Sequence, residues 1–442
     1  MKVRSAIVNV CLALLYALVY LRCYESFLYF HFEYVGYDLF HREPAFLAAS
    51  VAMAVLPVIC HRGYRAVSSV IAVLTYLVLY VPIVLTFALG SSKPVDEIAL
   101  IQLTFMAGMT LLFLADTFVI RNPLKLDIGI DLMPAVLGIT VLSTAYILFV
   151  YRGSLRFSSF EEELYVQRAA NATLGAGLVT RYVSSWLNTV FVPLCLAVGL
   201  SERRHRYTVG GSIACLVMYM ASANKLSILL PFVFVAFYLL LRTRLSLVLP
   251  LLTAAFSLLV AGMLAIANLG SAGFLAAAIV LSRTIGNSGQ LTMAYYDFFS
   301  FYAKTGYSHV SGLNLVSRPY PYGNLGLGQV VGQFYWSPDM NANANFWATD
   351  GLAALGLPGV AVISVAAALL FAVMNSVTQR YHQLFVVLCF VPFVTSFLNQ
   401  SLFSSFWSGG AFFLILFFAF NGRSVGPARM PVLFRPAVVL PT

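Results

Sequence analysis

Long apolar runs recur along this chain and limit its fold more than any other feature. Twelve runs approach the roughly 20 mainly apolar residues that a helix needs to cross a bilayer. They lie near residues 5–22, 45–60, 66–90, 98–120, 131–151, 182–200, 207–222, 226–241, 247–268, 357–378, 383–399 and 405–420. Because backbone polar groups in lipid must bond internally, these runs predict helices. We expect an all-α polytopic membrane protein with about 12 transmembrane helices (12–14).

Some of these spans have an alternative interpretation. The runs at 45–60, 226–241 and 405–420 are short enough to be re-entrant, and the apolar stretch at 274–281 is a candidate partial insertion. The first run resembles a signal sequence, but no small-x-small cleavage site ends it, so we expect it to remain as a helix.

The composition agrees with a membrane location. Hydrophobic residues make up 61% of the chain and charged residues 10%, whereas soluble domains have roughly 45–50% and about 25%. The six cysteines form no C-x-x-C pair and the six histidines form no i, i+4 pair, so we expect no metal and no cofactor. The chain has no G-x-x-x-x-G-K-[ST] motif, which argues against ATP as an energy source.

The positive charge is unevenly distributed among the gaps between runs. The formal net charge is +10, and 15 of the 26 Lys and Arg residues fall in gaps on one side if the N-terminus is cytoplasmic. Lys and Arg are enriched in short cytoplasmic loops, so the pattern places both termini in the cytoplasm. The basicity is therefore an insertion signal, and we expect no nucleic acid partner.

Two long gaps fall on the opposite side, at about 152–181 and 270–356. Connections longer than about 12–15 residues are usually functional or disordered. The second gap is rich in Tyr, Phe, Trp, Asn and Gly, which disfavours disorder. We expect two large periplasmic loops attached to a single integral membrane domain, 1–442.

Basic residues in these loops are candidates for binding phosphate. The guanidinium group of arginine matches phosphate oxygens and stays charged. At helix ends, Arg152 and Arg181 have the simpler interpretation of snorkelling to lipid headgroups. Glu161 to Glu163 are alternative partners for the loop arginines. The remaining candidates are Arg168, Arg283, Arg318 and Lys225, and a plain loop lysine is the alternative for the last.

The segment 338–350 is the most unusual in the chain. Asn341, Asn343 and Asn345 alternate with alanines, and Trp347 and Asp350 follow. Carboxamides both donate and accept hydrogen bonds, which suits sugar hydroxyls. The alternative is an Asn-rich turn in which Asp339 or Asp350 caps a helix. His309 is the only histidine of the second loop, with an exposed surface position as its simpler interpretation.

These residues resemble the Wzy-type O-antigen polymerases of Gram-negative bacteria. The resemblance rests on 338–346 and the helix start at 355–359, with 165–170, Asn224-Lys225 and Ser282-Arg283 fitting in order. It covers most of the chain and both long loops. The arginine-to-glycine spacing described for the family is absent after Arg168 and Arg283.

The resemblance implies a GT-C-like, metal-independent glycosyltransferase in the bacterial inner membrane. Donor and acceptor would both be oligosaccharides on undecaprenyl diphosphate, and a flippase and a chain-length regulator would be partners. The implied site has three parts. The catalytic candidates are Asp350, Asp339 and His309; the diphosphate-binding candidates are Arg168, Arg181, Lys225, Arg283 and Arg318; the sugar-binding candidates are Asn341, Asn343, Asn345, Trp347 and Tyr320.

Two other functions remain open from the sequence. An O-antigen ligase has a similar helix count and usually depends on a loop histidine near arginines, for which His309 is available. A transporter or flippase for lipid-linked sugars would be expected to have paired inverted repeats and broken helices. No such symmetry is evident in the chain.

Overall fold

The computed structural model describes residues 2–117, 130–158, 166–167, 170–171, 173–242, 245–310, 313–315 and 319–422. Within these ranges the regular secondary structure is entirely helical. Arg168, Arg318 and the side chain of Lys225 lie outside what is described.

Eight helices of the described chain are long and apolar enough to cross a membrane, and each matches a predicted run. They are Ala6–Val35, Val67–Gly90, Val95–Thr117, Met133–Val150, Leu178–Glu202, Leu245–Ile266, Leu357–Thr378 and Leu402–Phe420. The other four predicted runs are helical as well. Three form the shorter apolar helices Pro44–Cys60, Ser227–Leu241 and Gln383–Asn399, and the fourth lies in α11 (His205–Ser222). The prediction of a polytopic helical membrane protein is therefore confirmed at this level.

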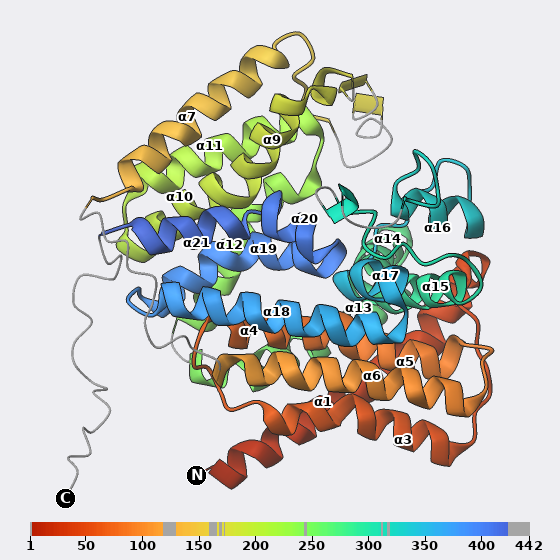
Figure 1. The fold of residues 1–442 in the computed structure, drawn as a ribbon. Coiled ribbons are helices and arrows are strands. Elements are labelled where there is room, and N and C mark those ends of the chain that lie inside the picture. Colours follow the sequence, from red (N-terminus) through yellow and green to blue (C-terminus); the bar gives the residue numbers. More distant parts are fainter. Residues whose placement is uncertain are drawn as a thin grey trace, which may run out of the picture.

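The helices form one bundle with its axes roughly aligned (Figure 1). One side holds α1 (Lys2–Cys23), α3 (Pro44–Val55), α4 (Val67–Thr75), α5 (Val81–Gly90) and α6 (Val95–Leu114), with α13 (Val248–Ile266) against α1. The other side holds α7 (Met133–Val150), α9 (Leu178–Trp186), α10 (Val192–Glu202) and α11. Between them lie α12 (Lys225–Leu241), α18 (Leu357–Thr378), α19 (Gln383–Asn399) and α21 (Ala411–Phe420).

The predicted second loop is largely helical. Ser271–Phe301 is an uninterrupted helical stretch made of α14 (Ser271–Ala277), the π-helix η9 (Ala278–Gly286) and α15 (Asn287–Phe301). It is followed by α16 (Leu327–Tyr335), the π-helix η11 (Trp347–Leu352) and α17 (Ala353–Leu355). These elements gather at one end of the bundle, opposite Lys2 and the last described residue of α21 (Figure 1). The short α20 (Leu402–Trp407) faces them.

A proline explains how two distant helices are joined to the bundle core. Pro82 has no N–H, so the carbonyls four and five residues before it, those of Val78 and Leu77, lack an intrahelical donor. The Ser288 hydroxyl of α15 donates to Val78 O at 2.6 Å, and the Tyr16 hydroxyl of α1 donates to Leu77 O at 2.6 Å. Exposed carbonyls are costly in lipid, so these bonds fix α1 and α15 against the π-helix η4 (Tyr76–Tyr80).

At the end of the bundle opposite α14 to α17, hydrogen bonds from polar side chains connect the helices. The Asn375 amide of α18 donates to Ser68 Oγ at 2.9 Å and accepts from Ser68 N at 3.2 Å. Arg380 donates to the carbonyls of Phe418, Ala419 and Asn421, and so caps the carboxyl end of α21. Cationic groups favour this position because carbonyls at a helix end are unpaired.

Candidate functional site

Two glycines bring α16 against the extended segment 341–345. Gly328 and Gly332 are four residues apart and so lie on one face of the helix. Ala342 N donates to Gly328 O at 2.8 Å, and a Cβ on Gly332 would lie 2.8 Å from the carbonyl carbon of Met340 and 3.0 Å from Ala342 N. No side chain fits this contact without displacing its neighbour. The sequence Gly-x-x-x-Gly therefore holds the asparagines in place.

The extended conformation sorts the alternating residues into two sets. Successive side chains of an extended chain point in opposite directions. Ala342 and Ala344 are buried, and Asn341 and Asn343 are exposed. The Tyr295 hydroxyl of α15 donates to Ala342 O at 3.0 Å and fixes the segment from behind. The segment therefore exposes Asn341 and Asn343 on one side and buries Ala342 and Ala344 on the other.

Asn345, the third asparagine of the segment, stabilises the local fold. Asn345 is 2% exposed, its amide nitrogen donates to Thr292 Oγ1 at 2.8 Å, and its Oδ1 accepts from the N–H groups of Trp347 and Ala348. Trp347 is fully buried and its Nε1 donates to Ser364 Oγ at 2.9 Å. Both residues were predicted to contact sugar, but the structure buries them in the start of η11 and in the core.

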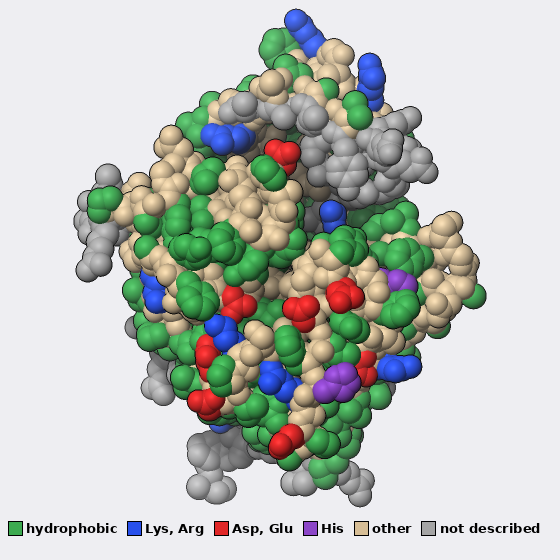
Figure 2. All heavy atoms as spheres, turned by 90° about the vertical axis from the view of Figure 1, so that its right-hand side faces the viewer, with side chains coloured by type: hydrophobic (Ala, Val, Ile, Leu, Met, Phe, Trp, Pro, Cys, Tyr) green, Lys and Arg blue, Asp and Glu red, His purple; other side chains and the backbone are tan. Residues whose placement is uncertain are grey.

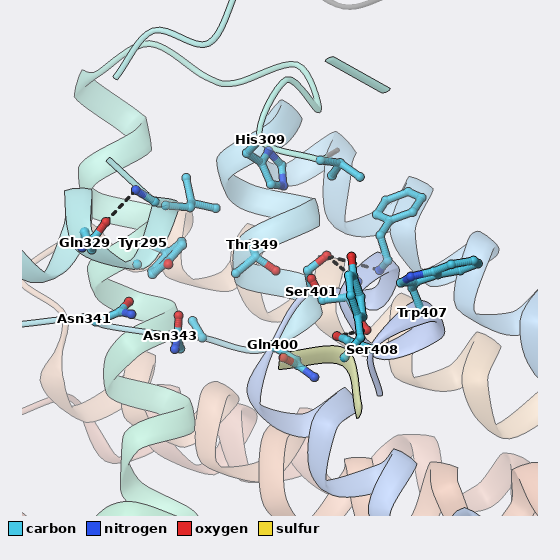
Figure 3. Close-up of a pocket in the computed structure, with 18 residues that line it drawn as sticks. Tyr295, His309, Gln329, Asn341, Asn343, Thr349, Gln400, Ser401, Trp407 and Ser408 are labelled. Atoms are coloured by element: carbon cyan, nitrogen blue, oxygen red, sulfur yellow. Dashed lines mark hydrogen bonds between the residues drawn. The ribbon is translucent and has the colours of Figure 1, made fainter. Parts of the chain in front are cut away.

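The exposed asparagines face a cavity of about 660 Å³. Its walls come from α9, α15, α16, α20 and the segments around 309 and 341–344 (Figure 3). The polar lining side chains are Tyr182, Tyr295, His309, Gln329, Asn341, Asn343, Thr349, Gln400, Ser401, Ser404 and Ser408, with Phe403 and Trp407 supplying aromatic surface. The volume is in the range of known small-molecule sites.

Three carboxamides in this cavity, those of Asn341, Asn343 and Gln400, have no hydrogen-bond partner within the described chain. Gln329 uses only its Oε1, which accepts from Gly326 N at 2.8 Å. These carboxamides face the cavity, so their donors and acceptors are free to bond to water or to a polar ligand there.

A histidine and a carboxylate meet at the cavity wall. His309 Nε2 lies 3.2 Å from Oδ1 of Asp350, whose Oδ2 accepts from Leu402 N at 2.6 Å. His309 Nδ1 lies 2.7 Å from Oγ1 of Thr305, and Thr305 is tied to Ala353 O through its backbone N–H at 2.8 Å. Asp350 is fully buried and the His309 side chain is 7% exposed. Both ring nitrogens of His309 are thus engaged in the described conformation.

Arg283 lines a smaller recess of about 60 Å³ beside the cavity. Its other lining residues include Asn287, Asn343 and Asn399, and Asn343 and Ala344 border both spaces. Arg283 is exposed and belongs to η9, where a π-helix widens the turn. Such segments occur frequently at functional sites.

The remaining predicted residues lie outside the cavity lining. Arg181 is exposed on α9, next to Tyr182, which does line the cavity. Asp339 is exposed in the turn after α16. Tyr320 is half-buried with its ring 5.6 Å from that of Tyr322, and burial raises its pKa to about 12. The structure therefore brings together His309 and Asp350, and Arg283 and Asn343.

Several lining residues were not predicted. Gln400 and Ser401 join α19 to α20, and Ser404, Trp407 and Ser408 follow. One signal was available: two apolar runs, at 383–399 and 405–420, are separated by a polar gap that contains no charged residue. Gln329 and Tyr182 carried no such signal, because each is an isolated polar residue in an ordinary context.

Figure 2 views the molecule from the end that holds the cavity. Lys, Arg, Asp, Glu and His side chains are scattered over this face among hydrophobic ones and do not gather into one patch. Comparisons with protein-family models, curated proteins and solved structures find no match to the chain.

The arrangement suits chemistry on a polar, multiply hydrogen-bonding molecule at the end of a membrane bundle. The described residues contain no group of three His, Cys, Asp or Glu side chains spaced to hold a metal ion. A cavity with free carboxamides and hydroxyls next to an arginine recess offers one region for uncharged polar groups and one for an anion.

Proposed function

We propose that this protein is an O-antigen polymerase of the Wzy type. It would transfer a growing glycan from undecaprenyl diphosphate onto a lipid-linked repeat unit at the periplasmic face of the bacterial inner membrane. The proposal includes a GT-C-like bundle of about 12 spans, with cytoplasmic termini, because the three shorter helices and α11 match predicted runs. A flippase and a chain-length regulator are the proposed partners.

The observation that carries the proposal is the junction between the two spaces at Asn343. The cavity would hold sugar units through carboxamides and hydroxyls, and the recess would hold the diphosphate at Arg283. The bond broken in glycan transfer joins these two chemical groups, so a shared border is where the reacting carbon must lie. Lys225, Arg168, Arg181 and Arg318 are further candidates for the anion.

The proposed step is a displacement at the anomeric carbon of the donor. An acceptor hydroxyl oxygen forms the new bond to this carbon while the carbon–oxygen bond to the diphosphate breaks, with inversion. The leaving diphosphate takes the electron pair, and the Arg283 guanidinium stabilises its added negative charge. The acceptor proton passes to His309, which lines the cavity, and Asp350, 3.2 Å from its Nε2, stabilises the resulting imidazolium.

The direct test is reconstitution. The full-length protein in nanodiscs is supplied with a synthetic undecaprenyl-diphosphate-linked repeat unit, and the products are resolved by mass. Lipid-linked dimers and longer chains are expected. Unchanged substrate across several repeat-unit structures would overturn the proposal, and movement of lipid-linked sugar across liposomes without lengthening would assign a flippase instead.

An O-antigen ligase is the second candidate, favoured by one observation. His309, the kind of loop histidine on which ligases usually depend, lies on the cavity wall. The two enzymes differ in acceptor. Deletion of a polymerase gene leaves lipid A core that carries one repeat unit, whereas deletion of a ligase gene leaves core with none, and a polysaccharide gel separates these outcomes.

A further inference from the structure

We infer that the cavity selects an uncharged sugar unit and discriminates against sugars that carry a carboxylate. The inference rests on the proposed function for the assumption that the ligand is a glycan. It concerns which class of repeat unit the protein accepts, and it follows from the polar groups that the cavity wall presents.

The carboxamides of the cavity wall are matched to neutral sugar groups. Asn341, Asn343 and Gln400 each present one amide group and one carbonyl oxygen with no described partner. A sugar hydroxyl both donates and accepts, and an acetamido group does the same through its N–H and C=O. Neutral units of either kind can therefore pair with both halves of each carboxamide.

The same wall is electrostatically unfavourable for a sugar carboxylate. A sugar carboxylate only accepts hydrogen bonds, so it can pair with the NH2 groups of the wall but not with the carbonyl oxygens beside them, whose partial negative charge faces it. The fully buried Asp350 lies next to His309 and adds an acidic group at the same wall. Like charges at close range repel. The guanidinium of Arg283 lines the neighbouring recess, where the proposed diphosphate requires it.

An aromatic surface lies opposite the carboxamides. Trp407 is 44% exposed and lines the cavity, with its ring stacked on Phe412 at 5.1 Å. Its backbone carbonyl accepts from Trp186 Nε1 at 3.4 Å, which supports α20 from the side of α9. A fixed aromatic face packs against the C–H surface of a sugar ring. This apolar contact is the same for neutral and for charged sugars. Selection therefore depends on the carboxamide wall.

The experiment measures binding alone. Two soluble trisaccharides that differ only in one unit, a neutral N-acetylhexosamine or a uronic acid, are titrated into the full-length protein in nanodiscs, with calorimetry as the readout. The neutral ligand is expected to bind at least about 10-fold more tightly, the size of effect produced by a few unsatisfied hydrogen bonds. Equal binding, or tighter binding of the uronate, overturns the inference.

Lysine substitutions at the cavity wall test the inference in a second way, through the change in uronate binding relative to the wild type. Asn343→Lys is expected to tighten uronate binding by about 10-fold and close the gap. Gln400→Lys provides a second position if the first variant fails to fold. Asn324→Lys adds the same charge to an exposed asparagine outside the cavity lining and is expected to leave the ratio unchanged. A similar shift in all three variants would mean that net charge, and not the cavity wall, sets the ratio.

Binding and transfer give separable failures. If the uronate binds as well as the neutral ligand while glycan lengthening occurs in nanodiscs, the specificity inference fails and the proposed function stands. If the neutral ligand is preferred but no lipid-linked substrate is lengthened, the cavity is a sugar site and the polymerase assignment fails.

Discussion

His309 Nε2 lies 3.2 Å from Oδ1 of Asp350, and the same carboxylate accepts the N–H of Leu402 at 2.6 Å. One buried side chain thus joins the loop after α15, the π-helix η11 and the start of α20. These segments supply three parts of the cavity wall. This carboxyl group therefore helps to fix both the position of the histidine and the shape of the cavity.

Asp350→Asn is expected to lower the rate of glycan transfer by about 100-fold, because the amide keeps the shape of the carboxylate but not its charge. The rate is measured in nanodiscs with the lipid-linked repeat unit. Asp38→Asn changes an exposed aspartate near the same end of the bundle and is the matched control. Full activity of Asp350→Asn, with a normal unfolding midpoint, would exclude a role for the carboxylate charge.

Arg283→Ala is expected to abolish long-chain glycan, with a loss of about 100-fold or more in transfer rate, since it removes the fixed charge beside the leaving group. Arg283→Lys should restore part of the rate. Arg152→Ala is the control, because this guanidinium lies over the Phe149 ring at a helix end, 5.2 Å from its centre. A normal ladder of polysaccharide from Arg283→Ala would contradict the assignment of the recess.

Gly332→Ala is expected to displace the asparagine segment, because the added Cβ would lie 2.8 Å from the carbonyl carbon of Met340 and 3.0 Å from Ala342 N. Overpacking of this kind costs about 1–3 kcal/mol. The thermal unfolding midpoint and the affinity for a neutral trisaccharide should both fall. Gly138→Ala, where nothing lies within 4 Å of the new Cβ, should leave both unchanged.

Ser288→Ala is expected to destabilise the bundle by about 1–3 kcal/mol, because Val78 O then loses the donor that Pro82 cannot supply. The unfolding midpoint in detergent measures the effect. Ser300→Ala removes an exposed hydroxyl bonded only to its own helix, to Tyr296 O, and should have little effect. Equal midpoints for the two variants would show that water or lipid satisfies the carbonyl.

Acidification is expected to destabilise the protein through His61, which follows the last residue of η3 (Leu56–Cys60). Its ring nitrogens are buried without a partner in the described chain, and burial lowers its pKa to about 4. Because the folded pKa is depressed, stability is full above the unfolded value near 6.5 and falls as the pH drops toward 4. The loss amounts to about 3 kcal/mol.

The unfolding midpoints of wild type and His61→Leu, compared from pH 7 to pH 4, isolate this contribution. The variant should lose less stability over this range. His205→Leu, at an exposed position, should follow the wild type. Parallel curves for wild type and His61→Leu would show that another group dominates the acid response.

Much of the framework was predictable from local patterns. Every apolar run became a helix because a chain in lipid has few other ways to pair its backbone groups, and 341–344 carried its alternation into the structure. At the end of the segment the alternation no longer predicts which side chain is exposed. Asn345 continues the pattern, but the chain leaves the extended conformation there, and its side chain bonds to the backbone of η11.

The sequence by itself determined the membrane class, the places of the helices in the twelve apolar runs and the segment that would carry polar groups. These follow from composition and periodicity, which act over a few residues. Only the tertiary structure decided that His309 meets Asp350, that Arg283 borders the asparagines and that Gln400 and Trp407 complete the cavity. Such contacts join segments tens of residues apart, and no local periodicity encodes them. They arise from how the helices pack. One example is the pair of carbonyls that Pro82 leaves without a backbone donor, which accept hydrogen bonds from Tyr16 and Ser288.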